Sequence, residues 1–285
     1  MFVIVGIGIV LGAVIGGFLM EGGNLHILFQ PSEVVIIFGA ALGGFLISSP
    51  SKIVGIVSKN VLTIVGGKSH SKRQYLELLS LLYQLFSKIR KEGLVSVESD
   101  IENPDRSPIF QKFGSVLSNH HVVNFICDNL KVIVTANVPP HELDNLMEIE
   151  IDTHHHEAMI PSHSVARVAD ALPGLGIVAA VLGVVLTMGK IDQPPSVLGH
   201  SIGAALVGTF LGVLMCYGFV GPIAANLEHQ AQEKGFFLQV IKVALVAFVG
   251  GSAPQMAVEF GRRAIPDVEK PTFSELENQV RGKAK

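Results

Sequence analysis

The sequence contains no tryptophan, only two cysteines and little charge. Of its 285 residues, 16% are charged and 49% are hydrophobic, with a mean hydropathy of +0.49. A soluble domain carries nearer a quarter charged residues, so an integral membrane protein is the class to test first. The net charge of −3 gives no reason to expect a nucleic acid partner. Cys127 and Cys216 lie far apart, in a polar and an apolar region. We therefore expect both to be small apolar side chains that fill packed space, and we expect no disulfide between them.

Charge is absent from four long apolar runs, which predict membrane spans. The runs are Met1–Met20, Val34–Ser51, Ala171–Gly189 and Val197–Ala225. A helix as long as the third run measures about 28 Å, close to the hydrocarbon thickness of a bilayer. The first run lacks the basic leader and cleavage site of a secretory signal, so we expect it to be retained. Small residues four apart favour close helix packing in lipid, and the first two runs have glycines at this spacing: Gly8, Gly12, Gly16, Gly39 and Gly43.

The segments between and after these runs have the composition of soluble protein and predict helices. The apolar side chains of Tyr75–Lys91 recur on one helical face, and Gly93 is expected to end that helix. Strand alternation is not evident. Further helices are expected at about Val122–Val134 and Pro140–His156.

Phe236–Val249 is apolar enough to resemble a fifth span. However, Lys242 lies near its middle, where insertion into the membrane would cost about 2.5–3.5 kcal/mol. We therefore expect a buried or interfacial helix outside the bilayer.

Basic residues predict the orientation of the spans. Of the 21 Lys and Arg residues, only Lys190 lies in the two short connections, Glu21–Glu33 and Lys190–Ser196. Because cytoplasmic segments are enriched in Lys and Arg, both termini and the large polar insert are expected in the cytoplasm. We predict an all-α integral membrane protein with four transmembrane helices, a large helical cytoplasmic insert between spans 2 and 3, and a cytoplasmic C-terminal tail. The expected segments are 1–51 (first hairpin), 52–170 (cytoplasmic helical domain), 171–225 (second hairpin) and 226–285 (C-terminal helices and tail).

The interiors of the four predicted spans offer no carboxylate. Ion passage through lipid normally requires an ionisable or coordinating group at depth. Asp170 and Glu33 lie at span ends, and the interiors hold only hydroxyl groups such as those of Thr187 and Thr209. If the protein conducts ions, we therefore expect another chain to supply the acid.

Several stretches along nearly the whole chain resemble one family, the MotA, TolQ and ExbB proton channels. They are Gln30–Ile37, Asp100–Pro104, Leu172–Ala180, Val207–Gly212 with Tyr217–Phe219, Ala257–Arg262 and Pro271–Glu277. ExbB and TolQ proteins typically have three spans, so four spans favour the MotA branch.

The resemblance implies a stator subunit of the bacterial flagellar motor in the inner membrane, which couples inward proton flow to torque. It implies a pentamer in membrane lipid around a MotB-like, single-span, peptidoglycan-anchored partner that supplies the membrane carboxylate, and contact with the rotor switch protein. No cofactor and no enzymatic activity are expected. The alternatives are an ExbB/TolQ-type energiser of envelope transport, a sodium-driven stator, or a membrane scaffold without conductance.

The resemblance also assigns roles to individual residues. Arg90 and Glu98 match positions that engage the rotor, although the residues alone suggest a cation at a helix C-terminus and a solvated acid. Pro173 and Pro222 match prolines that couple channel events to cytoplasmic movement. A simpler interpretation is that proline is tolerated in the first turn of a helix, with Asp170 as a possible N-cap before Pro173, and that proline ends helices.

Two further positions bear on the ion. By resemblance Thr209 lines the ion path, although its hydroxyl has the alternative of bonding a carbonyl one turn back. Sodium-driven relatives generally have threonine at the position of Ala180; alanine offers no oxygen ligand, so we expect protons.

Histidines do not predict a metal site. Neighbours on a helix diverge by about 100°, so His154, His155 and His156 do not converge on one ion, and His163 is further along. We expect a solvated, pH-sensitive face there. His200 lies near the outer end of the fourth span. We interpret it by default as a polar surface residue; the alternative is a histidine that titrates near neutral pH.

Overall fold

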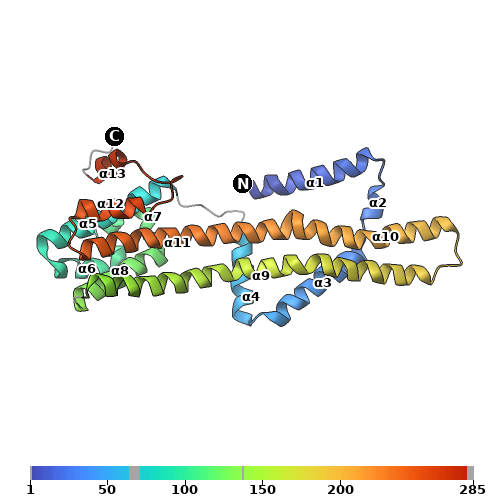
Figure 1. The fold of residues 1–285 in the computed structure, drawn as a ribbon, viewed down its shortest axis with the longest axis horizontal. Helices are drawn as coiled ribbons and strands as arrows, with labels where there is room; N and C mark the ends of the chain where they lie inside the picture. Colours follow the sequence, from blue (N-terminus) through green and yellow to red (C-terminus); the bar gives the residue numbers. More distant parts are fainter. Residues whose placement is uncertain (1, 64–70, 137, 281–285) are drawn as a thin grey trace. The chain divides into compact units, whose positions relative to one another are not determined.

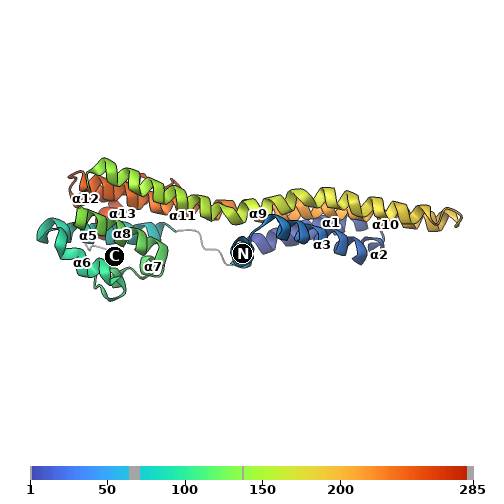
Figure 2. The same cartoon turned by 90° about the horizontal axis from the view of Figure 1, so that it is seen from below.

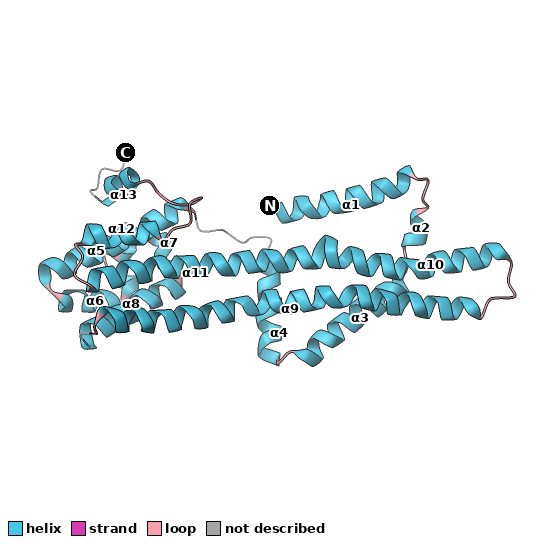
Figure 3. Cartoon of the chain, viewed as in Figure 1, coloured by secondary structure: helices cyan, strands magenta, loops and turns pink. Residues whose placement is uncertain are grey.

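The structure, a computed structural model, describes residues 2–63, 71–136 and 138–280, and all regular elements in these ranges are helical (Figures 1 and 3). This confirms the predicted all-α class. The chain forms two units: unit 1 is Met1–Gly67 with Ala158–Gln230, and unit 2 is Lys68–Glu157 with Ala231–Lys285. Helices α9 (Pro140–Met188) and α11 (Gly221–Val249) contribute residues to both.

The unit boundaries, between residues 157 and 158 and between 230 and 231, fall inside these two helices. Pro140–His156 was expected as a separate helix but is the beginning of α9, and Phe236–Val249 is the end of α11. Periodicity identified both stretches as helical, but it did not show that α9 continues through Pro161 and Pro173 into the apolar run. The predicted segments describe where the chain would cross a membrane, and they stay predictions.

Unit 1 contains the apolar helices. Its elements are α1 (Phe2–Met20), α2 (Leu25–Leu28), α3 (Pro31–Ser48), α4 (Ser51–Thr63), the C-terminal part of α9, α10 (Pro195–Leu214), a π-helical segment (Met215–Val220) and the start of α11. Among the described residues, four helical segments are long and apolar enough to cross a membrane: Phe2–Met20, Leu25–Ser48, and stretches within Pro140–Met188 and Pro195–Val249.

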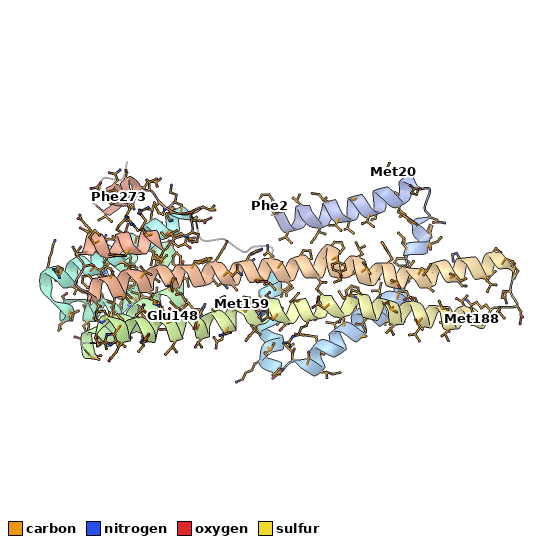
Figure 4. The ribbon with its side chains drawn as sticks, in the orientation of Figure 1. Phe2, Met20, Glu148, Met159, Met188 and Phe273 are labelled. Carbon is orange, nitrogen blue, oxygen red and sulfur yellow. The ribbon has the colours of Figure 1, made fainter. Side chains whose placement is uncertain are left out.

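Much of the apolar surface of these helices is exposed. Phe2 and Met20, which mark the two ends of α1 in Figure 4, are 89% and 90% exposed, and Ile47 of α3 is 91% exposed. Contiguous apolar surface of this kind is unfavourable in water and suits contact with lipid or with other chains.

Helices α9 and α10 lie side by side in both views of unit 1 (Figures 1 and 2), and glycine sets their separation. A Cβ atom on Gly176 would lie 2.7 Å from the carbonyl oxygen of Gly208, and one on Gly212 would lie 2.5 Å from the carbonyl oxygen of Leu172. Any side chain at these positions would push the backbones apart.

The predicted glycine repeats are not used in this way within the chain. A Cβ atom on Gly8, Gly12, Gly16, Gly39 or Gly43 would meet no described atom within 4 Å. The spacing is therefore compatible with close packing, but the chain's own contacts use other glycines.

Unit 2 is built around helix α5 (Lys72–Glu92), which confirms the helix predicted over Tyr75–Lys91. The backbone N–H of Ser71 donates to Gln74 Oε1 (2.9 Å) at its start, and Gly93, with φ +89°, ends it as predicted. Around α5 lie η2 (Leu94–Val97), α6 (Glu98–Glu102), η3 (Pro104–Arg106), η4 (Phe110–Lys112), α7 (Gly114–Leu117), α8 (His120–Ala136), the N-terminal part of α9, the C-terminal part of α11, α12 (Pro254–Arg263) and α13 (Phe273–Val280).

The core of unit 2 is apolar and aromatic. Leu81 and Leu82 are fully buried, and each contributes about 1.5–3 kcal/mol by leaving water. Phe86 of α5 stacks on Phe248 of α11, with ring centroids 4.3 Å apart. Cys127 is buried here, and Cys216 is buried in unit 1. Both are free thiols, which confirms that they form no disulfide.

Lys242 is buried in this core, as expected for a helix packed within protein. Its ammonium group contacts Asp144 Oδ1 (3.1 Å) and donates a hydrogen bond to Glu148, which is labelled on α9 in Figure 4. Burial lowers the pKa of Lys242, but the hydrogen bonds to Glu148 and Asp144 outweigh burial and raise it. The two carboxylates therefore make an apolar helix with one central lysine compatible with a folded core.

We predict unequal effects from removing the two sides of this ion cluster. Asp144→Asn with Glu148→Gln should lower the free energy of unfolding by about 2–3 kcal/mol, because a buried ammonium then loses its charged partners. Lys242→Met should cost less than about 1.5 kcal/mol, because the side chain stays apolar and the carboxylates, about half exposed, return to water. Chemical denaturation of the full chain in detergent, followed by circular dichroism, measures both.

The control is Lys131→Met, which breaks an exposed pair with Asp128 and should change stability by less than about 1 kcal/mol. Equal losses in the double carboxylate variant and Lys242→Met would contradict the prediction.

Candidate functional site

Arg90 and Glu98, the predicted rotor-contacting residues, are both exposed on unit 2. Arg90 lies in the last turn of α5 and Glu98 begins α6, with the short η2 segment between them. Neither residue forms an ion pair with a described residue. The position of Arg90 agrees with the cation at a helix C-terminus that the residues alone suggest. Both charges are therefore available to a partner.

A buried polar network fixes the segment that carries Glu98. Asp100 is buried and accepts hydrogen bonds from Lys88 Nζ (2.8 Å) and Ser107 Oγ (2.5 Å). The Ser107 hydroxyl in turn accepts a hydrogen bond from the Ile109 backbone N–H (3.2 Å). This network ties α6 to α5 and to the following turn. Asp100–Pro104 is visible in the sequence as a family-like stretch, but its role in positioning α6 follows only from these contacts.

The two predicted coupling prolines have different surroundings. Pro222 is exposed in the first turn of α11, directly after the π-helical segment. The wider π turn accommodates a residue that has no N–H to donate. Pro173 is half-buried inside the continuous helix α9, so its interpretation as a first-turn proline capped by Asp170 is wrong. A proline at that point removes one backbone hydrogen bond and weakens the helix locally.

The predicted ion-path residues lie on the facing helices α9 and α10. Ala180 is buried, and Thr209 is half-buried. Within the described residues the Thr209 hydroxyl makes no hydrogen bond, whereas Thr187 donates to the Gly183 carbonyl (2.8 Å). The Thr209 hydroxyl therefore remains available to a ligand.

Glu33 enters the same region from α3, and sequence reasoning missed this. It lies in the first turn of α3, as a span-end position implies, but its carboxylate is buried against glycines of α9 and α10. Its position at a span end agrees with the prediction, but its burial among the apolar helices was not predicted. The available signal was spacing: Glu33, Ile37 and Ala41 share one helical face, and all three are buried.

The family-like stretch at Ala257–Arg262 stabilises unit 2 through an ion cluster and hydrogen bonds. Both Glu259 oxygens accept hydrogen bonds from Arg262 (Nε and Nη2, each 2.7 Å), and Arg263 Nε adds another at 3.0 Å. The hydrogen bonds from Arg262, against the effect of burial, lower the pKa of Glu259. Arg262 also donates to the Pro271 carbonyl (2.9 Å), which connects α12 to the segment before α13.

The histidines of α9 contact a neighbouring helix. His154 is half-buried and packs edge-on against His121 of α8, with ring centroids 4.9 Å apart. Burial lowers the pKa of His154, and the nearby His121 and Lys234 lower it further, with Glu157 opposing them. The prediction of a solvated face is therefore wrong at His154, which is packed against α8. His163 and His200 are exposed.

Two family models match the chain. Residues 4–93 match the model of the motility protein A N-terminal region, and residues 117–235 match the MotA/TolQ/ExbB proton channel family. Together with four membrane-length apolar helices, these matches define a subunit of that channel class.

Relatives narrow the class further. Motility protein A of Escherichia coli is 43% identical over 281 residues, covering 99% of this chain and 95% of that protein. Motility protein A of Salmonella typhimurium is 42% identical with the same coverage, and the chemotaxis protein LafT of Vibrio parahaemolyticus is 35% identical over 95% of each chain. The chain belongs to the motility protein A family.

Solved structures share the fold. The C. jejuni MotAB structure matches with a TM-score of 0.78 at 19% identity, covering 95% of this chain and 98% of that one. The flagellar MotAB stator complex from Bacillus subtilis matches with a TM-score of 0.72 at 21% identity, covering 90% and 92%.

We predict that unit 2 loses stability as the pH falls below about 6.5, the ordinary pKa of histidine. Because the pKa of His154 is lowered in the folded chain, the unfolded chain binds the proton more readily over this window, so acid favours unfolding. His154→Gln should flatten this dependence. The measurement is the Tm of the purified full chain in detergent between pH 7.5 and 5.5.

The matched control is His120→Gln, which removes an exposed histidine from the start of α8 and should leave the pH dependence unchanged. An unaltered slope in His154→Gln would refute the assignment to this residue.

Proposed function

We propose that this chain is the proton-driven stator subunit of a bacterial flagellar motor, coupling inward proton flow to torque on the rotor. The observation that carries the proposal is the 43% identity with motility protein A of Escherichia coli over nearly the full length of both chains. The similarity extends through the apolar helices and unit 2, so both the channel part and the torque-transmitting part are covered.

The chain would lie in the inner membrane with four spans and with both termini and unit 2 in the cytoplasm. The exposed apolar helices of unit 1 support insertion in lipid. The concentration of Lys and Arg outside the two short connections supports the orientation.

Its partners would be further copies of itself, a pentamer by resemblance, and a MotB-like single-span subunit anchored to peptidoglycan. The supporting observation is the outward-facing apolar surface of α1 and α3, which the chain itself leaves uncovered. The partner's membrane carboxylate would receive protons that pass Ala180 and Thr209. Since Ala180 offers no side-chain oxygen to a hard cation, the transported ion would be the proton.

Torque would pass from α9 and α11 to unit 2 and from there to the rotor switch protein. Pro173 would permit bending of α9, because it removes a backbone hydrogen bond inside that helix. Pro222 would permit bending at the π-helical turn that precedes α11. Arg90 and Glu98 would make the rotor contact. Exposed ion pairs are weak, which suits a contact that forms and breaks at every step.

A strain that lacks the gene is expected to assemble flagella that do not rotate. Expression of this chain should restore rotation, because torque depends on this subunit. The speed of restored swimming should follow the proton-motive force and show no requirement for sodium. Swimming speed in media of fixed proton-motive force and varied sodium measures both properties.

Normal swimming of the deletion strain would overturn the stator function. A strict sodium requirement would overturn only the assignment of the ion.

Arg90→Glu and Glu98→Lys are each expected to lower torque about two- to fivefold. An exposed charge pair contributes about 0.5–1 kcal/mol, which corresponds to this range of occupancy. Torque of tethered cells is the measurement, with membrane content of the chain determined by immunoblot.

The control is Arg106→Glu, a reversal of another exposed charge on unit 2 that should leave torque unchanged. Unchanged torque in both Arg90→Glu and Glu98→Lys would remove the rotor role.

A further inference from the structure

Glu33 is a buried acid with no described partner in the apolar unit. Its side chain belongs to the face of α3 that also buries Ile37 and Ala41, and the residue is only 6% exposed. Its Oε2 atom is shielded from solvent and makes no hydrogen bond or ion pair with any described residue. An unpaired carboxylate in such surroundings is costly, so its presence requires an explanation.

Two glycines make room for the carboxylate. A Cβ atom on Gly208 of α10 would lie 2.5 Å from Glu33 Oε2, and a Cβ atom on Gly183 of α9 would lie 3.6 Å from Oε1. Any larger residue at position 208 would displace the acid. The side chain therefore occupies a space formed by both helices.

The carboxylate lies at the level of the proposed ion path. The Cβ position of Gly208 that lies 2.5 Å from Oε2 is also 3.1 Å from the backbone nitrogen of Ala180, and Thr209 follows Gly208 directly in α10. Three elements, α3, α9 and α10, thus bring an acid, a buried alanine and a hydroxyl without a hydrogen bond to one region of unit 1.

We propose that Glu33 is a proton-binding group of the ion path, contributed by this chain in addition to the acid of the partner subunit. Its carboxylate accepts a proton from a hydronium ion, which leaves water, and forms the neutral acid, which an apolar site stabilises relative to the charged form. It then releases the proton to the next acceptor, a water molecule or the partner's carboxylate, and returns to its original charge. This inference rests on the proposed stator function.

The competing explanation is structural. A negative charge in the first turn of a helix interacts favourably with the helix dipole, and the volume of the side chain fills a space between helices. Such a role affects how much complex assembles, but not the rate at which each assembled complex transfers protons.

The test uses the deletion strain that expresses the full chain with its partner. Rotation is recorded with a small bead and with a large bead attached to the flagellum. The small bead gives a low load, at which ion transit limits speed, and the large bead gives a high load, at which torque per complex limits speed. Glu33→Gln keeps the shape but cannot release a proton, so we expect speed at low load to fall at least about tenfold while torque at high load changes less than twofold. Glu33→Asp keeps an acid at a longer transfer distance and should give an intermediate speed with a larger slowing in D₂O than the unaltered chain.

The control is Glu21→Gln, the same substitution at an exposed acid after α1, which should change neither reading. Low-load speed of Glu33→Gln equal to the unaltered chain overturns the proposal. So does a loss at both loads that matches a reduced amount of complex in the membrane. If Glu33→Gln does not assemble, Glu33→Asp decides: unaltered speed and D₂O response overturn the proposal. Failure of the unaltered chain to restore rotation would instead overturn the stator function itself.

Discussion

The close contact between α9 and α10 is the constraint on which the apolar unit depends. Gly176, Gly208 and Gly212 allow the two backbones to approach until carbonyl oxygens and α-carbons of one helix touch the other. In lipid, where the hydrophobic effect does not hold helices together, such packing is a principal source of association. One of these glycines, Gly208, together with Gly183 also leaves the space in which Glu33 lies, so helix packing and the position of the buried acid are linked at Gly208.

Unit 2 is stabilised differently. Its core contains a large set of leucine and phenylalanine side chains, and the buried charged groups among its described residues have partners. Lys242 has Asp144 and Glu148, Asp100 has Lys88 and Ser107, and Glu259 has Arg262 and Arg263. Each of these networks joins neighbouring elements of unit 2. The one around Asp100 joins α5 to α6, the two helices that carry the exposed Arg90 and Glu98.

The long helices explain how the two kinds of unit can act together. Helices α9 and α11 each continue without interruption from unit 1 into unit 2, and each contains a proline in or next to its apolar part. A continuous helix transmits displacement better than a loop does, while a missing backbone hydrogen bond gives it a point of bending. This combination supports the proposed coupling of channel events to movement of unit 2.

Much of this organisation was determined by the sequence alone. Four uncharged runs long enough to cross a bilayer, the helical face of Tyr75–Lys91, the stop at Gly93 and the burial of Phe236–Val249 all follow from local composition and periodicity, which physical chemistry converts directly into structure. The family-like stretches also identified Arg90, Glu98, Ala180 and Thr209 as candidates. Their roles rest on the resemblance, although the structure leaves the first two exposed and places the last two on facing helices.

Only the tertiary structure decided which groups meet. It joined expected separate helices into α9 and α11, assigned close packing to Gly176, Gly208 and Gly212 instead of the regular repeats in α1 and α3, and buried Glu33 although its position in the sequence is at a span end. The physical reason is that helix formation depends on neighbours in the sequence, whereas burial and close approach depend on contacts between residues far apart in it, such as Gly176 with Gly208 or Glu33 with Gly208.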